Sequence, residues 1–457
     1  MQLSFHGGVR GVTGSCFLIE TKKAKVLIDC GMFQGERMVA KDNLRKFGFD
    51  PKKINALIIT HAHYDHTGRV PVLTQQGFNG SIFTTPPTKA LTLIILEDAQ
   101  HVMEENFEKY GDEILFKPAD IQKMHPLMQG INYHTQFEPI PGLSAMFHDA
   151  GHILGSAYVS IDVAGSETKN GQPMRIVFSG DIGNDGVPIL PETEPISSAD
   201  VIVAESTYGN RDHEPVFERG LKLSNFITKI INRGGTVLIP AFSIERTQEL
   251  LYEMDQLIEH NLIPEVPIFL DSPLAIKATG IYRDFKHYLQ FDASILESID
   301  KDFFSFPNLQ ETLSVDASKV INRHQEPKII IAGSGMMTGG RILHHALRYL
   351  PDEKSGILFI GYQAEGTLGR QIIDGKKKVH INREDVELKA TIEAIGSFSA
   401  HGDRSKIARW LQPEDGPVKE IYLVHGDTEV KAEFKLYLED RLPGKIHIPK
   451  YQEKFEY

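Results

Sequence analysis

The stretch Thr60-His61-Ala62-His63-Tyr64-Asp65-His66-Thr67-Gly68 places three histidines and one aspartate within six residues. It directly follows the apolar run 56–60, which is typical of a short strand buried on both faces. Neutral imidazole and carboxylate are the ligands that Zn²⁺ prefers where thiolate is absent. At a strand end, His61 and His63 point the same way, and the next turn brings Asp65 and His66 within reach of a second ion. The stretch therefore predicts a metal site, with exposed histidines that hold no metal as the alternative.

One segment cannot supply every ligand of two ions, so further ligands must lie elsewhere in the chain. Three other segments carry a His or an Asp near the end of an apolar run: Phe147-His-Asp-Ala-Gly-His152-Ile-Leu-Gly-Ser156, Phe178-Ser-Gly-Asp181-Ile-Gly183 and Leu423-Val-His425-Gly-Asp427. Taken singly, such residues are more often helix caps or turn residues. Together with the first stretch they predict one cluster, in which the carboxylate of Asp181 can bridge two ions.

Apolar runs of four or five residues recur along the whole chain. The clearest are 25–29, 56–60, 175–179, 201–204, 236–240, 328–332, 356–360 and 420–424. Helical periodicity lies between some of these runs, over 88–110 and 245–260. Strands that alternate with helices predict an α/β protein with layered sheets.

Length, charge and cysteine content exclude several classes of protein. The 457 residues are enough for two or three domains. With 49 Lys and Arg against 61 Asp and Glu, the net charge of −12 excludes a nucleic-acid binder that relies on a broad basic surface, although it leaves room for a basic groove. Cys16 and Cys30 are too few for a disulfide framework. No signal peptide and no apolar run of membrane-spanning length is visible, so we expect a cytoplasmic protein without membrane contact.

The motifs HAHYDH, GHILGSA and FSGDIG resemble motifs 2, 3 and 4 of the metallo-β-lactamase fold. Downstream segments resemble the β-CASP subgroup of RNA-processing nucleases, whose bacterial and archaeal members are homologues of the nuclease subunit of the cleavage and polyadenylation specificity factor. These segments are 204–209 for motif A, 397–401 for motif B, 424–426 for motif C, and the stretch 361–370. The resemblance implies an αββα metallo-β-lactamase domain over 1–208 and 387–457. It also implies an inserted α/β β-CASP domain over 209–386 and an active site in the cleft between the domains.

The resemblance also assigns the metal ligands. It implies that His61, His63 and His152 hold one Zn²⁺, that Asp65, His66 and His425 hold a second, and that Asp181 bridges the two. Two ions about 3.5–4 Å apart would activate a bridging hydroxide for in-line attack on phosphorus. Asp65 therefore counts among the catalytic residues as well as among the ligands.

The same resemblance points to a proton donor for the leaving 3′-oxygen. His401 is the expected general acid, oriented and kept protonated by Glu205, because a carboxylate partner raises the pKa of an imidazole. Hydrolysis of RNA would then leave 5′-phosphate and 3′-hydroxyl ends. A histidine satisfied within a loop is the alternative for His401.

Four residues of the β-CASP region are candidates for contact with RNA. The glycine-rich segment 332–341 has neither the Lys-Ser/Thr of a P-loop nor the third glycine of a dinucleotide-binding loop. We interpret it as a strand-to-helix turn whose amides, around Ser334, Gly335 and Met336, can cradle a phosphate, with a tight turn that binds nothing as the alternative. Arg370 either contacts the RNA backbone or forms a surface salt bridge. Other histidines receive no site role: His6, His101, His125, His134, His344 and His345.

Several functions stay open at this level. The first is a zinc-dependent ribonuclease acting on single-stranded RNA in the interdomain cleft, endonucleolytic with 5′-3′ exonuclease activity as an option. A small-molecule hydrolase of the thioesterase or lactonase type lacks an insertion of this size, and a non-catalytic scaffold subunit of an RNA-processing complex does not need a complete ligand set. A DNA-repair member of the subgroup is disfavoured by the histidine of motif C. A homodimer through the lactamase-like domain rests on analogy alone.

Overall fold

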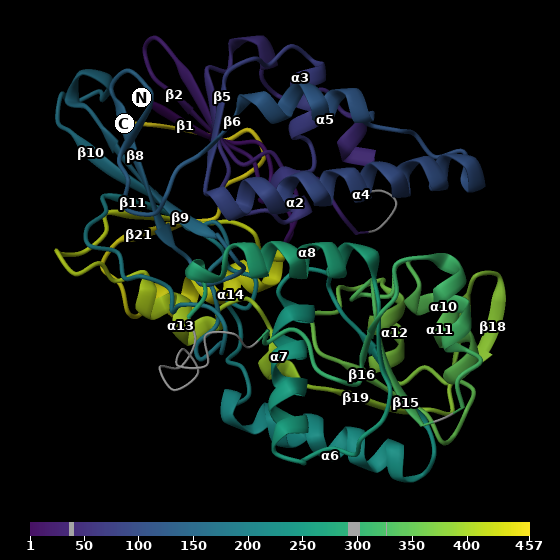
Figure 1. Cartoon of the computed structure of the whole chain (residues 1–457). Helices are drawn as coiled ribbons and strands as arrows, with labels where there is room; N and C mark the ends of the chain where they lie inside the picture. The colour runs from purple at the N-terminus through teal and green to yellow at the C-terminus, as the bar shows by residue number, and fades with distance from the viewer. Residues whose placement is uncertain (36–40, 291–301, 326) are drawn as a thin grey trace. The chain divides into compact units, whose positions relative to one another are not determined.

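The computed structural model describes the chain from Met1 to Tyr457 except residues 36–40, 291–301 and 326. Its contacts divide the chain into two compact units (Figure 1). Unit 1 comprises Met1–Asp185, Pro191–Asp212 and His401–Tyr457, and unit 2 comprises Gly186–Leu190 and His213–Ala400. Among the described residues, no helix combines the length and the apolar character that a membrane span requires.

Unit 1 contains two seven-stranded mixed sheets. In spatial order, the first sheet consists of β22 (Lys454–Glu456), β1 (Gln2–Phe5), β2 (Phe17–Glu20), β3 (Lys25–Ile28), β4 (Ala56–Ile58), β5 (Ser81–Thr84) and β6 (Met128–Gly130). The second consists of β21 (Lys445–His447), β20 (Glu420–Leu423), β11 (Val201–Ala204), β10 (Met174–Phe178), β9 (Ala157–Val163), β8 (Leu143–Asp149) and β7 (Phe137–Ile140). Strands β3 to β6 run parallel, as do β10, β11, β20 and β21.

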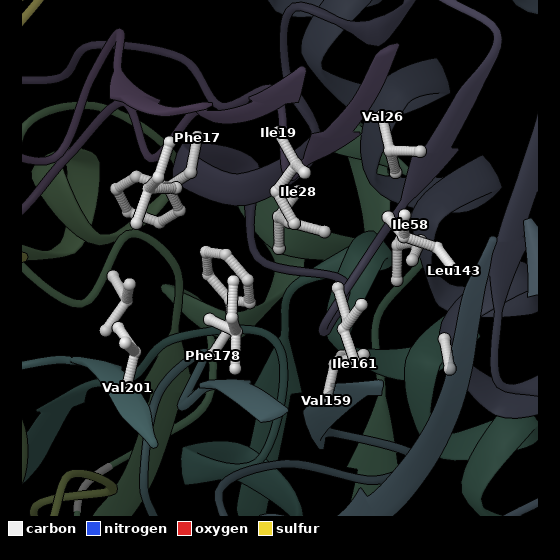
Figure 2. Packing of buried hydrophobic residues seen from close by; sticks show 14 of the residues in the cluster. Phe17, Ile19, Val26, Ile28, Ile58, Leu143, Val159, Ile161, Phe178 and Val201 are labelled. Atoms are coloured by element: carbon white, nitrogen blue, oxygen red, sulfur yellow. The ribbon is translucent and has the colours of Figure 1, made fainter. Parts of the chain in front are cut away.

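The two sheets face each other across a core of fully buried side chains. Figure 2 shows Phe17 and Ile28 of the first sheet opposite Phe178 and Ile161 of the second. Alternate residues of each strand point into this core because successive side chains of a strand point to opposite faces. Burial of this apolar surface stabilises the pairing of the sheets by roughly 25 cal/mol per Å².

Helices cover the outer face of each sheet in unit 1. On the first sheet, Leu57 and Ile82 pack in one cluster with residues of α3 (Val70–Gln75), α4 (Pro86–Tyr110) and α5 (Pro118–Met124). On the second, Val177 and Ile202 pack with α13 (Arg404–Trp410) and α14 (Thr428–Glu439). The order helices–sheet–sheet–helices is the αββα sandwich that the motifs predicted.

Unit 2 is a six-stranded parallel sheet with helices and a small hairpin. Its strands, in spatial order, are β14 (Leu309–Glu311), β13 (Ile268–Asp271), β15 (Lys328–Ala332), β12 (Thr236–Pro240), β16 (Gly356–Phe359) and β19 (Thr391–Ala394). The hairpin pairs β17 (Lys378–Ile381) with β18 (Glu384–Glu387). Among the described residues, its helices are α6 (Arg219–Asn232), α7 (Arg246–Glu259), α8 (Pro273–Asp284), α10 (Val315–Ile321), α11 (Ile342–Tyr349) and α12 (Leu368–Ile373). The inserted region is thus α/β, as the resemblance implied, and the structure adds that its main sheet is parallel.

The predicted elements appear with small shifts at their ends. Each of the eight apolar runs forms a strand, and the two periodic segments form α4 and α7. Helix α4 begins earlier than the periodicity suggested, because Thr85 caps it by accepting a hydrogen bond from the Thr88 amide and Pro86 occupies its first position. It ends at Tyr110 because the next residue, Gly111, has a φ of 72°, the left-handed conformation that glycine adopts without strain.

Candidate metal centre

The candidate centre in unit 1 lies where several strands end. His61 and His63 follow β4 of the first sheet, whereas Asp181 follows β10 and His425 follows β20 of the second. The loop with His152 follows β8, which runs in the same direction as β10 because each is antiparallel to β9. The carboxyl ends of these strands meet at one edge, and the sheet topology therefore gathers residues that are hundreds of positions apart.

Asp65 and His66 reach the same place through a short helical turn. Helix α2 (Tyr64–Thr67) begins directly after His63, and the His66 amide donates to the His63 carbonyl at 3.0 Å. The turn changes the chain direction, so Asp65 and His66 face a second ligand group beside that of His61 and His63, as the spacing predicted.

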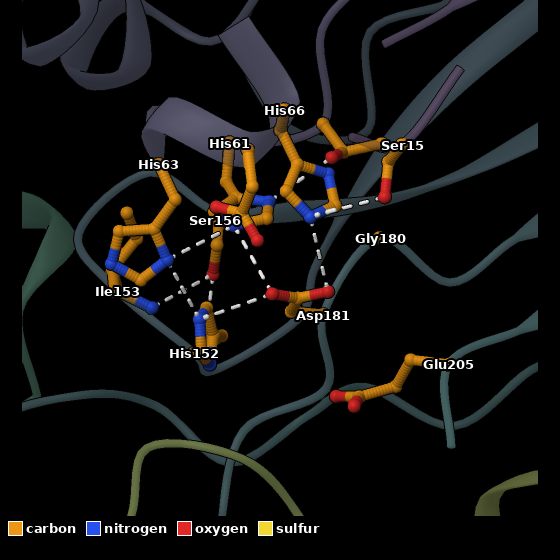
Figure 3. Close-up of polar contacts among 12 residues, drawn as sticks. Ser15, His61, His63, His66, His152, Ile153, Ser156, Gly180, Asp181 and Glu205 are labelled. Atoms are coloured by element: carbon orange, nitrogen blue, oxygen red, sulfur yellow. Dashed lines mark hydrogen bonds and ion pairs between the residues drawn. The ribbon is translucent and has the colours of Figure 1, made fainter. Parts of the chain in front are cut away.

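Four side chains form the first ligand group: His61, His63, His152 and Asp181. The His63 Nδ1 atom lies 3.2 Å from His61 Nε2 and 3.2 Å from His152 Nε2. Asp181 Oδ2 lies 3.4 Å from His61 Nε2 and 3.6 Å from His152 Nε2 (Figure 3). Metal–ligand bonds of 2.0–2.1 Å in a tetrahedron imply edges of about 3.3–3.4 Å between ligand atoms. The four distances match those edges, so these residues fit a tetrahedral cation such as Zn²⁺.

Asp65, His66 and His425 form the second ligand group. The Nε2 atom of His425 lies 3.1 Å from Asp65 Oδ2 and 3.4 Å from His66 Nε2. His66 Nε2 lies 3.3 Å from Asp181 Oδ1, the carboxylate oxygen opposite the one in the first group. Within the described residues this buried oxygen has no hydrogen-bond partner. Asp181 thus presents one oxygen to each group, which is the geometry of a bridging ligand.

Burial sets the protonation of the first group. It lowers the pKa of His61, of His152 and of His63, the last to about 3, so these imidazoles are neutral and offer a lone pair. Burial opposes the charge of Asp181 as well, but the surrounding histidines, led by His425, hold its pKa well below the usual range. In the first group, neutral imidazoles beside an ionised carboxylate are the protonation states that metal binding requires. In the second group, burial favours the neutral ring of His66, but Asp181 and Asp29 hold its pKa well above the usual range, so this ring must release a proton when an ion binds.

Three hydrogen-bonding residues that sequence reasoning did not single out orient the ligands. Asp29 accepts from His66 Nδ1 at 2.7 Å, which turns His66 Nε2 towards the centre. The Thr60 hydroxyl lies 3.1 Å from His61 Nδ1, and the Thr207 hydroxyl lies 3.2 Å from His425 Nδ1. The only sign of Asp29 in the sequence is its position at the end of an apolar run.

His401 and Glu205 form a pair beside the ligands. His401 Nδ1 lies 3.2 Å from both carboxylate oxygens of Glu205 and 3.9 Å from Asp181 Oδ2. Glu205 is fully buried and accepts from the amides of Ile182, at 2.6 Å, and Thr207, at 3.3 Å. Burial of His401 favours the neutral ring, but the charge and hydrogen bond of Glu205 outweigh it and raise the pKa of His401 to about 9. The geometry therefore supports a protonated imidazole held by a fixed carboxylate.

The predicted RNA contacts lie in unit 2, on a turn and on a helix, which are joined by a hydrogen bond from the Gly369 amide to the Met336 carbonyl at 3.2 Å. Ser334, Gly335 and Met336 lie between β15 and α11, and the Ser334 hydroxyl accepts from the Thr338 amide at 3.0 Å, within the same turn. Arg370 lies on α12 and forms an ion pair with Asp374 at 2.9 Å. The salt bridge that the sequence offered as the alternative for Arg370 is thus present.

Three family models match successive parts of the chain. They describe the metallo-beta-lactamase superfamily over residues 9–86, the Beta-Casp domain over 247–372 and the Zn-dependent metallo-hydrolase RNA specificity domain over 385–449. Together with the αββα sandwich and the histidine–aspartate cluster, they show that this chain belongs to the β-CASP branch of the metallo-β-lactamase superfamily. The family expected from the motifs is confirmed.

Similar proteins match over almost the whole chain. "Ribonuclease TTHA0252" of Thermus thermophilus is 37% identical over 94% of this chain and 94% of its own length. An "RNase J-like protein" of Methanocaldococcus jannaschii is 32% identical over 98% of this chain and 97% of its own. "Transcription termination factor FttA" of Methanosarcina mazei is 30% identical over 93% of this chain, which spans 66% of that protein. A solved structure of a protein of unknown function from Enterococcus faecalis V583 shares the fold, with a TM-score of 0.55, 13% identity and 99% coverage of both chains.

Proposed function

We propose that this chain is a metal-dependent ribonuclease that hydrolyses phosphodiester bonds of single-stranded RNA. The names of two relatives, both ribonucleases, and the match to an RNA specificity domain support RNA as the substrate. The observation that carries the proposal is the His401–Glu205 pair, 3.9 Å from the central Asp181. A thioesterase expels a thiolate, which leaves without a general acid, whereas the 3′-oxygen of RNA is a poor leaving group until it is protonated.

The proposed metal complement is two Zn²⁺ per chain. One ion would be held by His61, His63 and His152. The other would be held by Asp65, His66 and His425, and Asp181 would be a ligand of both. A donor set of imidazoles and carboxylates without thiolate suits Zn²⁺ better than the oxygen-seeking Mg²⁺ or Ca²⁺. When bound, two such ions supply an activated water and neutralise charge on the phosphate.

The chain itself supplies the proton for the leaving group. Glu205 accepts a hydrogen bond from His401 Nδ1 and orients the ring, so that Nε2 carries the proton that passes to the 3′-oxygen. Because the amides of Ile182 and Thr207 hold the carboxylate, the ring keeps its position as the charge changes. Protonation of the 3′-oxygen leaves a 3′-hydroxyl end on one product and a 5′-phosphate on the other.

The remaining assignments belong to the same proposal. The functional domains are 1–208 with 387–457 for the metallo-β-lactamase part and 209–386 for the β-CASP part. Ser334, Gly335 and Met336 would contact phosphate through their amides, and Arg370 would exchange Asp374 for a phosphate. Endonucleolytic cleavage is the principal activity proposed, with 5′-3′ exonuclease activity and a homodimer as additions to be tested.

The test is cleavage of an RNA labelled at both ends, with metal content measured on each variant. The wild type should cut the RNA and leave 5′-phosphate ends, and EDTA should abolish the activity. His401→Ala should keep its metal and lose about 10²–10⁴-fold in rate, the range for a removed general acid. His101→Ala, at an exposed histidine of α4, is the matched control and should cleave at the wild-type rate.

Four results would contradict the proposal. A metal-loaded wild type that cuts no RNA but hydrolyses a thioester would indicate the small-molecule hydrolase, and one that hydrolyses neither would indicate a scaffold. Loss of metal from His401→Ala would make that residue a ligand and not the acid. Full activity in EDTA would reject metal dependence altogether.

A further inference from the structure

Outside the candidate centre, unit 1 brings together a second group of metal-ligating side chains. His134, His148 and Glu194 each offer one ligand atom, and these atoms lie within 4.8 Å of one another. His134 lies between β6 and β7, His148 lies on β8, and Glu194 lies between β10 and β11. The sequence contains no local spacing that connects them, which explains why His134 received no site role.

The backbone fixes His134 in place. Its φ of 58° is in the left-handed region, and its amide donates to the Phe147 carbonyl at 2.9 Å. From this position Nε2 lies 2.8 and 3.0 Å from the two carboxylate oxygens of Glu194. The side chain of His134 is 61% exposed, so an ion from solvent can reach it.

His148 is oriented by its neighbours on β9. Its ring stacks on Tyr158, with centroids 4.6 Å apart and planes 7° apart, and its Nε2 lies 2.9 Å from the Ser160 hydroxyl. The other ring nitrogen, Nδ1, lies 3.6 Å from Glu194 Oε2. When Nε2 donates to Ser160, the lone pair on Nδ1 and the Glu194 carboxylate are both available to a cation placed between them. In the other tautomer, Nδ1 carries the proton and donates towards Glu194.

Glu194 is held at both ends of its backbone. Its amide donates to the Asp149 carbonyl at 3.0 Å, and its carbonyl accepts from Trp410 Nε1 at 3.0 Å. The Asp149 amide in turn donates to Glu194 Oε1 at 3.3 Å. The carboxylate is therefore a preorganised ligand, since little side-chain freedom is left to lose on binding.

We propose that His134, His148 and Glu194 bind an additional divalent transition-metal ion, of the Zn²⁺ class, separate from the candidate catalytic centre. Two imidazoles and one carboxylate form the donor set of open zinc sites, whose remaining position is taken by water. Mg²⁺ and Ca²⁺ prefer oxygen ligands throughout and do not suit it. The alternative is a surface ion pair between His134 and Glu194 that binds no metal.

The chain offers a matched control for that alternative. His101 and Glu105 of α4 form an exposed His–Glu pair 3.4 Å apart, and among the described residues they belong to no group of three ligands. If a His–Glu pair alone sufficed to bind zinc, this pair would bind it as well.

The test measures zinc content and does not depend on catalysis. The full chain is stripped with chelator and dialysed against about 10 µM free Zn²⁺, enough to fill a site with a Kd of about 1 µM. His134→Asn and Glu194→Gln should each hold one equivalent less than the wild type, whereas His101→Asn should hold the wild-type number. Asparagine is chosen at 134 because it tolerates the left-handed backbone, and Glu194→Gln tests the same site without changing residue 134.

Two outcomes would overturn the proposal. One is equal zinc content in the wild type, His134→Asn and Glu194→Gln. The other is the loss of an equivalent from His101→Asn as well, since this would show that zinc binds any exposed His–Glu pair. Because both outcomes rest on differences between variants, failure of the proposed ribonuclease activity leaves this test intact.

Discussion

Replacement of Asp29 by Asn tests whether the residues that hydrogen-bond to the metal ligands affect the affinity of the candidate centre for Zn²⁺. Asp29 Oδ1 accepts from the Thr60 amide at 2.8 Å, while Oδ2 accepts from the Thr60 hydroxyl at 2.8 Å and from His66 Nδ1 at 2.7 Å. Every group that faces the carboxylate is thus a donor. An Asn side chain presents its own N–H groups on one side, so one of these contacts becomes donor against donor.

The expected magnitude follows from the role of His66. With the amide nitrogen towards His66, the ring loses the acceptor that fixes its tautomer and its orientation. With the nitrogen towards Thr60, the backbone that enters the His61 stretch is displaced instead. Loss of such an outer partner typically weakens metal binding 10- to 100-fold, or about 1.4–2.7 kcal/mol.

The assay is competition for Zn²⁺ against a chromogenic chelator, in a His134→Asn background so that only the candidate centre contributes. Asp271→Asn is the matched control, because Asp271 is also fully buried and pairs with His345 Nε2 at 2.7 Å, but in unit 2. The Kd of one zinc equivalent should rise 10- to 100-fold in Asp29→Asn and stay within about twofold in Asp271→Asn. Unchanged affinity for both equivalents in a folded Asp29→Asn would refute the reasoning.

Two further predictions concern stability. Burial lowers the pKa of His6 from 6.5 to about 4; the unfolded state therefore binds more protons between these values, and stability is lost as pH falls through that window. In urea denaturation, the unfolding free energy of the wild type should fall by about 2 kcal/mol more between pH 7 and pH 5 than that of His6→Gln. An equal fall in both proteins would contradict this. Phe147→Ala should cost about 3–5 kcal/mol of unfolding free energy, because Phe147 is fully buried between the sheets. Phe217→Ala, at a side chain 84% exposed, should change it by less than about 0.5 kcal/mol, and equal effects of the two would exclude a packing origin.

Local patterns were sufficient to predict the elements and the type of site. A run such as 201–204 has no polar residue to place on a solvated face, and it forms the buried strand β11. The spacing of His61, His63, Asp65 and His66 contains its own geometry, because a strand end followed by one helical turn determines where all four side chains point. The metal chemistry was therefore predictable from six residues.

The partners of that segment depend on tertiary structure. His401 and Glu205 are 196 positions apart, and His66 and His425 are 359 apart. Resemblance to a family suggested these partners, but no spacing in the chain implies them. Glu205 and His425 meet because they follow the parallel neighbours β11 and β20, whereas His66 comes from the first sheet and a β-bridge to Gly183 holds His401 beside them.

The sequence by itself determined the α/β elements, the donor types and the first half of the candidate centre, since each depends on neighbours within a few residues. Tertiary structure alone decided that Asp29 orients His66, that Asp181 presents one oxygen to each ligand group, and that His134, His148 and Glu194 meet. The physical reason is that hydrogen bonds and ligand geometry act over about 3 Å in space, and only the packing of the two sheets brings distant residues to that distance.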